Sequence, residues 1–436
     1  MIGGVQNIGR VPELQRRILF TFGMLAVYRL GAHIVTPGIN PEVIRNFFEQ
    51  MGGTMFGLFN LFSGGALEQL SIFALGIMPY ISASIIFQLL TVVIPQLEQL
   101  QKEGEQGRRK ITQWTRYATV VIALVQSLLL AFALENGQFG ENAVIEAGWS
   151  FRIQMMLTLT TGTAFIMWLG EQITERGIGN GISLIIFTGI VISIPSALGS
   201  LFELIRTDQF TLLGALLLVA FTVLVTGVVV YCERAQRRIP IQHAKRVVGR
   251  KVMQGGMSYF PLRLNTAGVI PPIFASSILM FPLTITQFVE SETIQNFFSD
   301  YMSFGSTLYN AIYVALIVFF AFFYTAIVIN PADVADNIKR SGAYIPGIRP
   351  GKRTAEYIDR ILGRLTLLGA IYVSAVCILP VLLSNQVGVP FYFGGTALLI
   401  VVGVALDTVG QIEAHLVSRQ YEGFVKGTRI RGRLGR

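Results

Sequence analysis

The chain has 436 residues, of which 52% are hydrophobic and only 14% are charged. Soluble globular chains carry about 25% charged residues, so this composition argues against a soluble enzyme and predicts one membrane domain. The net charge of +9 comes from Lys and Arg in short segments between apolar runs, which favours membrane topology over nucleic-acid binding.

Ten membrane-spanning helices are predicted along the chain, because a helix needs about 20 apolar residues to cross a bilayer. Residues 18–36 form the first span, although Arg29 interrupts them. The next seven spans are charge-free stretches, at 69–97, 117–134, 153–170, 177–202, 209–232, 264–289 and 301–332. The last run, 365–406, is long enough for two helices, with a turn between Ser384 and Pro390.

Lys and Arg are distributed unequally between the two predicted sides. The N-terminus, the even-numbered connections and the C-terminus hold three, five, one, eight, seven and six of the 34, whereas the odd-numbered connections hold only Arg45, Arg152 and Arg206. Positively charged segments stay in the cytoplasm, so both termini, including the basic tail 413–436, are predicted to be cytoplasmic. The basic connections 233–265 and 332–364 are longer than a turn requires, which predicts a docking surface.

A short sequence repeat links the second and seventh predicted spans. Residues 76–86 and 268–278 agree at six of eleven positions, at a constant offset of 192 residues. The two spans run in opposite directions, so the match predicts inverted five-helix halves at 18–204 and 211–412, with a chance match among small residues as the alternative. In each copy a Pro follows a Gly, which predicts a break in the helix at that point.

Short apolar segments leave two interpretations open. Met55 to Leu67 is too short to cross the membrane, so it is either a re-entrant segment or an interfacial helix. Ile77 and Ile81, like Ile182 and Ile186, are spaced i and i+4 and share one side of a turn. Such pairs are typical of packing, but apolar side chains also close pores by excluding water.

Few polar groups interrupt the spans, and these few constrain the function. Gln88, Gln126 and Asn265 are able to hydrogen-bond between helices, at about 1 kcal/mol each. The chain has three His and two Cys, without metal-ligand spacing, a nucleophile elbow or a phosphate-binding loop, so no catalytic residue, metal or cofactor is predicted. Acidic residues are almost absent from the spans, which favours a passive channel over the alternative, an ion-coupled carrier for a small solute.

Several blocks of the chain resemble the bacterial SecY family. They lie at 62–67 (FSGGAL), 74–84 (ALGIMPYISAS), 102–105 (KEGE), 168–181 (WLGEQITERGIGNG), 346–351 (PGIRPG) and 390–396 (PFYFGGT), and the resemblance extends over essentially the whole chain. It implies an all-α integral membrane protein of ten helices, whose two inverted halves form a clamshell around a central pore. The implied function is the non-enzymatic, pore-forming subunit of a translocon, which passes unfolded polypeptides across the bacterial inner membrane and releases hydrophobic helices into lipid.

The resemblance also assigns roles to individual residues. It implies a pore ring of Ile77, Ile81, Ile182, Ile186, Ile273 and Ile400, and a plug within residues 55–67 that includes Phe62, Ser63, Gly64, Gly65 and Ala66. Gln88, Gln126 and Asn265 match the lateral gate, and Arg246, Arg250 and Arg349 match docking sites for the SecA motor and the ribosome. The other implied partners are the SecE and SecG subunits, signal peptides, unfolded precursor proteins and membrane lipid.

Overall fold

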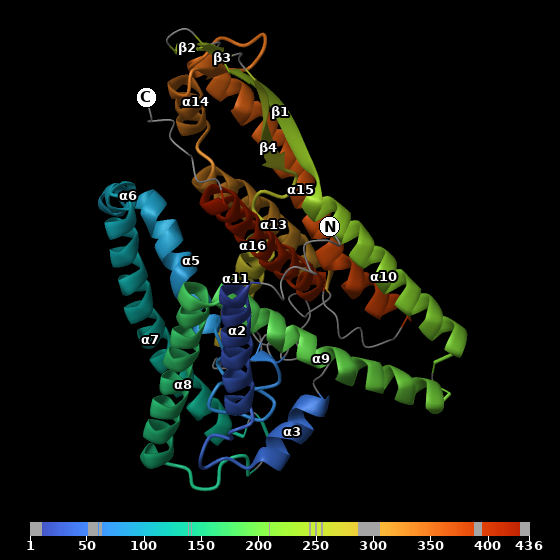
Figure 1. The fold of residues 1–436 in the computed structure, drawn as a ribbon. Coiled ribbons are helices and arrows are strands. Elements are labelled where there is room, and N and C mark those ends of the chain that lie inside the picture. Colours follow the sequence, from blue (N-terminus) through green and yellow to red (C-terminus); the bar gives the residue numbers. More distant parts are fainter. Residues whose placement is uncertain are drawn as a thin grey trace. The chain divides into compact units, whose positions relative to one another are not determined.

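The computed structural model describes residues 11–50, 60, 63–137, 139–140, 142–208, 210–243, 246–248, 251–253, 256–286, 306–387 and 395–427. The chain divides into two compact units (Figure 1). Unit 1 comprises Met1–Ser200 and Val404–Arg436, and unit 2 comprises Leu201–Gly403. Within the described residues, seven helices are long and apolar enough to cross a membrane, and one bent helix pair makes an eighth. The prediction of a helical protein with many spans is therefore confirmed.

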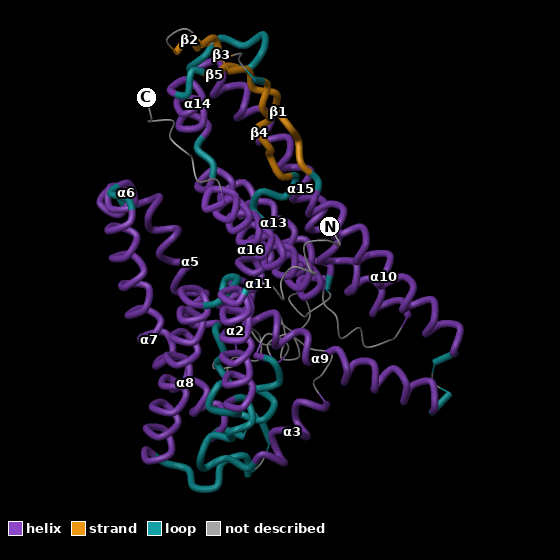
Figure 2. The backbone as a smooth tube through the Cα atoms, in the orientation of Figure 1, coloured by secondary structure: helices purple, strands orange, loops and turns teal. Residues whose placement is uncertain are grey.

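Unit 1 is a helical bundle built on two long helices that pack side by side, α7 (Glu105–Glu135) and α8 (Trp149–Arg176). Helix α5 (Met78–Val93) packs on α7, and α2 (Pro12–Gly31) packs on α8 (Figure 2). The unit also contains α3 (Pro41–Gln50), α6 (Pro95–Lys102), most of α9 (Gly181–Arg206) and the C-terminal part of α16 (Gly395–Gly427).

The second predicted span is not one continuous helix. Residues 64–76 form turns, α5 begins at Met78, and the chain bends by 100° between α5 and α6. The expected helix break at Pro79 was wrong, because this proline lies in the first turn of α5, where a backbone N–H has no helical partner anyway.

The same local structure recurs at the repeated sequence in unit 2. Gly76 has φ +55° and Gly268 has φ +64°, a left-handed conformation that favours glycine, and a helix begins two residues after each. Helix α11 (Ile270–Thr286) thus starts in the same way as α5, with Pro271 in its first turn, and the break expected there was wrong for the same reason.

Unit 2 has a helical part and a β-containing part. Helix α13 (Thr307–Val328) packs between α11 and α15 (Lys352–Val387), and α10 (Leu212–Arg234) precedes the first strand. Strands β1 (Gln236–His243), β4 (Met257–Arg263) and β5 (Ala343–Tyr344) form an antiparallel sheet in the order β4-β1-β5. A separate ladder pairs β2 (Arg246–Val248) with β3 (Lys251–Met253).

The strands show that the all-α prediction was wrong for the connections between spans. In β1, Ile239 and Ile241 are buried while Pro240 and Gln242 are exposed, which is the alternation of a strand with one covered face. This face packs on α14 (Pro331–Arg340) and the start of α15. The shared core contains Ile239, Ile241, Leu262, Ile338, Ala343, Ile345, Ile358 and Leu362. The two basic connections therefore form one folded element, which we call the basic-connection module (residues 236–263 and 331–362).

Candidate functional site

Two adjacent side chains of α2 hold the end of the segment predicted to be the plug. The Tyr28 hydroxyl donates a hydrogen bond to the Ser63 carbonyl oxygen at 2.9 Å, and Arg29 Nη1 donates to the Gly64 carbonyl oxygen at 2.8 Å. Tyr28 is buried, and its ring stacks on Phe73 at 5.9 Å between centroids. Arg29, the charge inside the first span, is therefore satisfied by a backbone carbonyl.

The chain is tightly constrained at Gly64. Its φ is +66°, and a Cβ at this position would lie 2.8 Å from Cα of Gly189 on α9. Only glycine allows both the turn and this approach of two backbones. The Asn60 side chain closes the turn, since it donates to Glu68 Oε2 at 2.9 Å and accepts from the Glu68 N–H at 3.0 Å.

The isoleucines predicted to line the constriction in unit 1 are mostly buried. Ile77 and Ile81 are covered, and the Ile81 N–H donates to the Ile77 carbonyl at 3.1 Å, so the pair lies on one side of the first turn of α5. On α9, Ile186 is buried and Ile182 is partly buried.

The start of α9, which carries these two isoleucines, is fixed by side chains of the same unit. Asn180 Oδ1 accepts from the Ile182 N–H at 3.1 Å, and Thr174 Oγ1 accepts from the Gly181 N–H at 2.9 Å. Gln411 of α16 accepts from the Gly179 N–H at 2.9 Å. These contacts hold the first turn of α9 in place.

The remaining predicted ring residues belong to unit 2. Ile273 is partly buried in the first turn of α11, and Ile400 is buried in α16. The six-residue ring draws on both units and stays a prediction.

The three predicted gate residues have different surroundings. Gln88 of α5 makes a long contact with Ser84 Oγ at 3.4 Å, and Gln126 lies partly buried on α7, the neighbour of α5. Asn265 in unit 2 is buried, and its Nδ2 donates to Glu233 Oε1 at 2.7 Å and to the Gly268 carbonyl at 3.0 Å. The gate grouping of these three residues stays a prediction.

Arg349 projects from the basic-connection module. Its side chain is exposed, while its carbonyl oxygen accepts from Thr354 Oγ1 at 3.1 Å and the Ile348 N–H donates to the Ile345 carbonyl at 3.0 Å. A fixed backbone thus presents an exposed positive side chain. Arg246 pairs through its backbone with Met253, but its side chain, Arg250 and the plug residue Phe62 lie outside the described residues.

Sequence reasoning missed the partners of these residues. Tyr28, Gly189 and Glu233 contact predicted functional residues, yet each is distant in sequence from the residue it contacts. Of these three partners, only Glu233 stands out in the sequence, because it is the first charged residue after the apolar stretch 209–232 and marks the end of that span.

Comparisons with known proteins decide the family. The SecY family model matches residues 71–409. The chain belongs to the SecY family. It is 50% identical over 427 residues to the protein translocase subunit SecY of Escherichia coli strain K12, covering 97% of this chain and 96% of that one. The corresponding subunit of Pseudomonas aeruginosa is 51% identical over 428 residues, with the same coverage of the two chains.

Solved SecY-type structures share the fold. A structure described as a protein-conducting channel covers 93% of both chains, with a TM-score of 0.62 and 19% identity. Sec61 in a canine ribosome-channel complex also covers 93% of both chains, with a TM-score of 0.63 and 16% identity. This member of the SecY family is thus a multi-pass membrane protein with the fold of these channels.

Proposed function

We propose that the chain is the protein-conducting subunit of a bacterial protein translocase. It passes unfolded secretory polypeptides across the inner membrane and releases hydrophobic helices sideways into lipid. The proposal rests on one observation: the chain has 50–51% sequence identity to protein translocase subunits over 97% of its length. The role of this chain is a passive pore, and a motor or the elongating ribosome drives transport.

In this function the isoleucines form an apolar constriction. Ile77, Ile81, Ile182 and Ile186 from the first half and Ile273 and Ile400 from the second would surround the translocating chain. Branched apolar side chains offer no hydrogen bonds to a passing polypeptide and oppose wetting when the pore is empty. The burial of Ile81 and Ile186, and the fixed start of α9, support this role.

The segment 55–67 acts as the plug. Its described end is held by Tyr28 and Arg29 and rests against Gly189, which supports a closed seal in the resting state. A related solved structure, with a TM-score of 0.64 and 18% identity, concerns a SecY plug domain that stabilises the closed channel and maintains a membrane seal.

Ten helices in two inverted halves, 18–204 and 211–412, form the clamshell. Support comes from the repeated start of α5 and α11, where a left-handed glycine is followed by a helix with a proline in its first turn. A structural repeat at the same offset as the sequence repeat favours duplication over chance. The lateral gate, with Gln88, Gln126 and Asn265, would open between the halves.

Both termini and the basic-connection module face the cytoplasm. Exposed Arg349, with Arg246 and Arg250, would dock the SecA motor and the ribosome, whose RNA is a polyanion. The relative Sec61 is described in a ribosome-channel complex, which supports the ribosome as a partner. SecE and SecG complete the channel, and signal peptides, unfolded precursors and lipid are its other partners.

Reconstitution tests this function. Vesicles that contain the chain with SecE and SecG should take up a secretory precursor when SecA and ATP are both added. No uptake should occur when SecA or ATP is left out. Absence of uptake, with a SecA preparation that is active on another translocon, would refute the proposal.

A further inference from the structure

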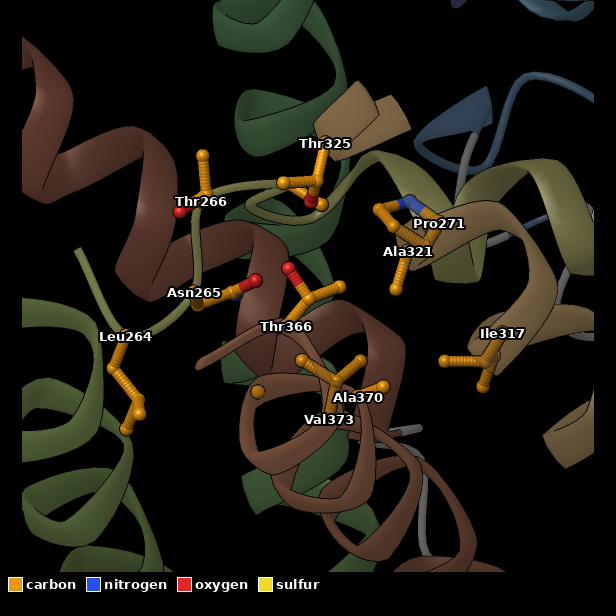
Figure 3. Close-up of a pocket in the computed structure, with 12 residues that line it drawn as sticks. Leu264, Asn265, Thr266, Pro271, Ile317, Ala321, Thr325, Thr366, Ala370 and Val373 are labelled. Atoms are coloured by element: carbon orange, nitrogen blue, oxygen red, sulfur yellow. The ribbon is translucent and has the colours of Figure 1, made fainter. Parts of the chain in front are cut away.

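A small cavity in unit 2 lies beside the start of α11, between this helix, α13 and α15 (Figure 3). It is partly enclosed and has room for about one water molecule. Most of its wall is apolar, with Ile317, Ala321 and Val373, but four polar side chains also line it. Thr266 donates to the Arg263 carbonyl at 3.1 Å, which leaves Asn265, Thr325 and Thr366.

Thr325 is one of the buried threonines whose hydroxyl lacks a hydrogen-bond partner among the described residues. Its side chain is only 5% exposed. Other helical threonines of the same unit donate to the carbonyl four residues earlier, such as Thr222 to Leu218 at 2.9 Å and Thr226 to Thr222 at 2.7 Å. The Thr325 hydroxyl is available to the cavity instead.

The other two polar groups converge on the same space. Thr366 of α15 is also 5% exposed, and its hydroxyl faces the Asn265 side chain in Figure 3. Because Asn265 Nδ2 already donates to Glu233 and to the Gly268 carbonyl, the amide oxygen is the group left for the cavity. Two hydroxyls and one amide oxygen therefore line a space of the size of one water molecule.

We propose that the cavity binds one ordered water molecule that bridges Thr325 Oγ1, Thr366 Oγ1 and Asn265 Oδ1. A buried water typically makes about three hydrogen bonds, whereas cavities that stay empty have entirely apolar walls. A water molecule both donates and accepts, so it satisfies the Thr325 hydroxyl and the Asn265 oxygen together.

The bridge has a structural consequence at the base of α11. It connects α13, α15 and the segment 264–268, whose left-handed Gly268 lies two residues before the start of α11. It thereby fixes the Asn265 side chain, which in turn holds the carbonyl of Gly268. If α11 moves when the gate opens, which rests on the proposed function, the water is part of what holds its first turn in the resting state.

An experimental structure of the complete channel complex, at a resolution that shows ordered water, tests the site directly. We expect a solvent peak at about 2.7–3.2 Å from both threonine oxygens. Well-defined side chains without such a peak, or a direct hydrogen bond from Thr325 to another protein group, would overturn the proposal.

Thermal stability gives a second test, because the sign of the change in thermal midpoint distinguishes a water-bound Thr325 hydroxyl from an unpartnered one. Thr325→Val replaces the hydroxyl with a methyl group of similar size. With a bridging water the variant loses hydrogen bonds, and the thermal midpoint of the purified complex falls; with an unpartnered hydroxyl it rises. Thr325→Ser, which keeps the hydroxyl, should retain the peak, and Thr222→Val is the matched control outside the cavity.

A double variant tests whether the two threonines share one water. Thr325→Val and Thr366→Val together should lower the midpoint by clearly less than the sum of the single shifts, since either change alone disrupts the bridge. Additive shifts would argue against a shared water.

Transport supplies the final readout. Thr325→Val should raise uptake of a precursor with a weakened signal sequence about fivefold, while Thr222→Val should not. Unchanged uptake would refute the link between the water and the gate. If the unaltered complex transports nothing, the proposed function fails, whereas the solvent peak and the sign of the stability shift still decide the water site.

Discussion

At the scale of single residues, the contact between α2 and Ser63–Gly64 allows the hydroxyl of Tyr28 to be tested alone. Tyr28→Phe keeps the stacked ring against Phe73 but removes the donor to the Ser63 carbonyl. One neutral hydrogen bond contributes about 1 kcal/mol, so the resting channel should open about fivefold more often. Ion conductance of the reconstituted complex without substrate measures this change.

Arg29 should matter more than Tyr28, because charged donors form stronger hydrogen bonds. Arg29→Met removes the donor to the Gly64 carbonyl and should raise the resting conductance about tenfold or more. Arg17→Met, on the same helix but paired with Glu13 at 3.7 Å, is the control. Resting conductance equal to that of the unaltered complex in both plug-contact variants would contradict a role for these side chains in holding the plug.

The proposed apolar constriction is tested by polar replacement of one isoleucine. Ile81→Asn places a hydrated side chain at a buried position, which lowers the barrier to wetting and should raise ion leak through the resting pore. Ile86→Asn is a matched control, because Ile86 lies on the same helix but is 46% exposed. Equal leak in the two variants would remove Ile81 from the ring.

At the scale of elements, truncation of one side chain in the core of the basic-connection module should cause a local loss of structure. Leu262 is 1% exposed in this core, so Leu262→Ala should destabilise the module by about 2–5 kcal/mol. Limited proteolysis should then cleave residues 236–263 while the spans stay intact. Tyr259→Ala, at an exposed position of the same strand, should leave the module resistant.

Substitution of Arg349 distinguishes a role in docking from a role in the folding of the same module. Arg349→Glu reverses an exposed charge without touching the core, so SecA-driven uptake should fall strongly while protease resistance is retained. Lys352→Glu makes the same charge change three residues away and should have a smaller effect. A loss of protease resistance in Arg349→Glu would indicate a structural role instead.

Elements differ in how far the sequence predicts them. Charge-free stretches located the long helices well, since crossing a membrane demands length and apolarity together, as in α7, α8 and α10. The start of α5 at Met78 was missed, because hydropathy does not register the left-handed Gly76. Strand β1 was missed because its alternating Ile239 and Ile241 lie within a basic connection.

The site residues also differ in how far the sequence alone predicts their conformation and their contacts. Gly64 and Asn180 have conformations that follow from their residue types, a left-handed turn and a helix start. The contacts of Tyr28 with Ser63 and of Gly64 with Gly189 join residues 35 and 125 positions apart, which periodicity and spacing do not encode. Such partners become visible only once the helices are packed.

At the scale of the whole molecule, the unequal charge distribution predicts which connections face the cytoplasm. Cys232 and Cys377 are the native cysteines, so replacing both with Ser gives a background for single-cysteine labelling. In intact cells whose outer membrane has been permeabilised, a membrane-impermeant maleimide should label Glu146→Cys, in an exposed odd-numbered connection, but not Arg353→Cys. Arg353→Cys should become reactive only after the inner membrane is broken, because it lies in the basic eighth connection. Labelling of Arg353→Cys before lysis would indicate the opposite topology, with the basic-connection module on the side of the membrane away from the proposed docking of SecA and ribosomes.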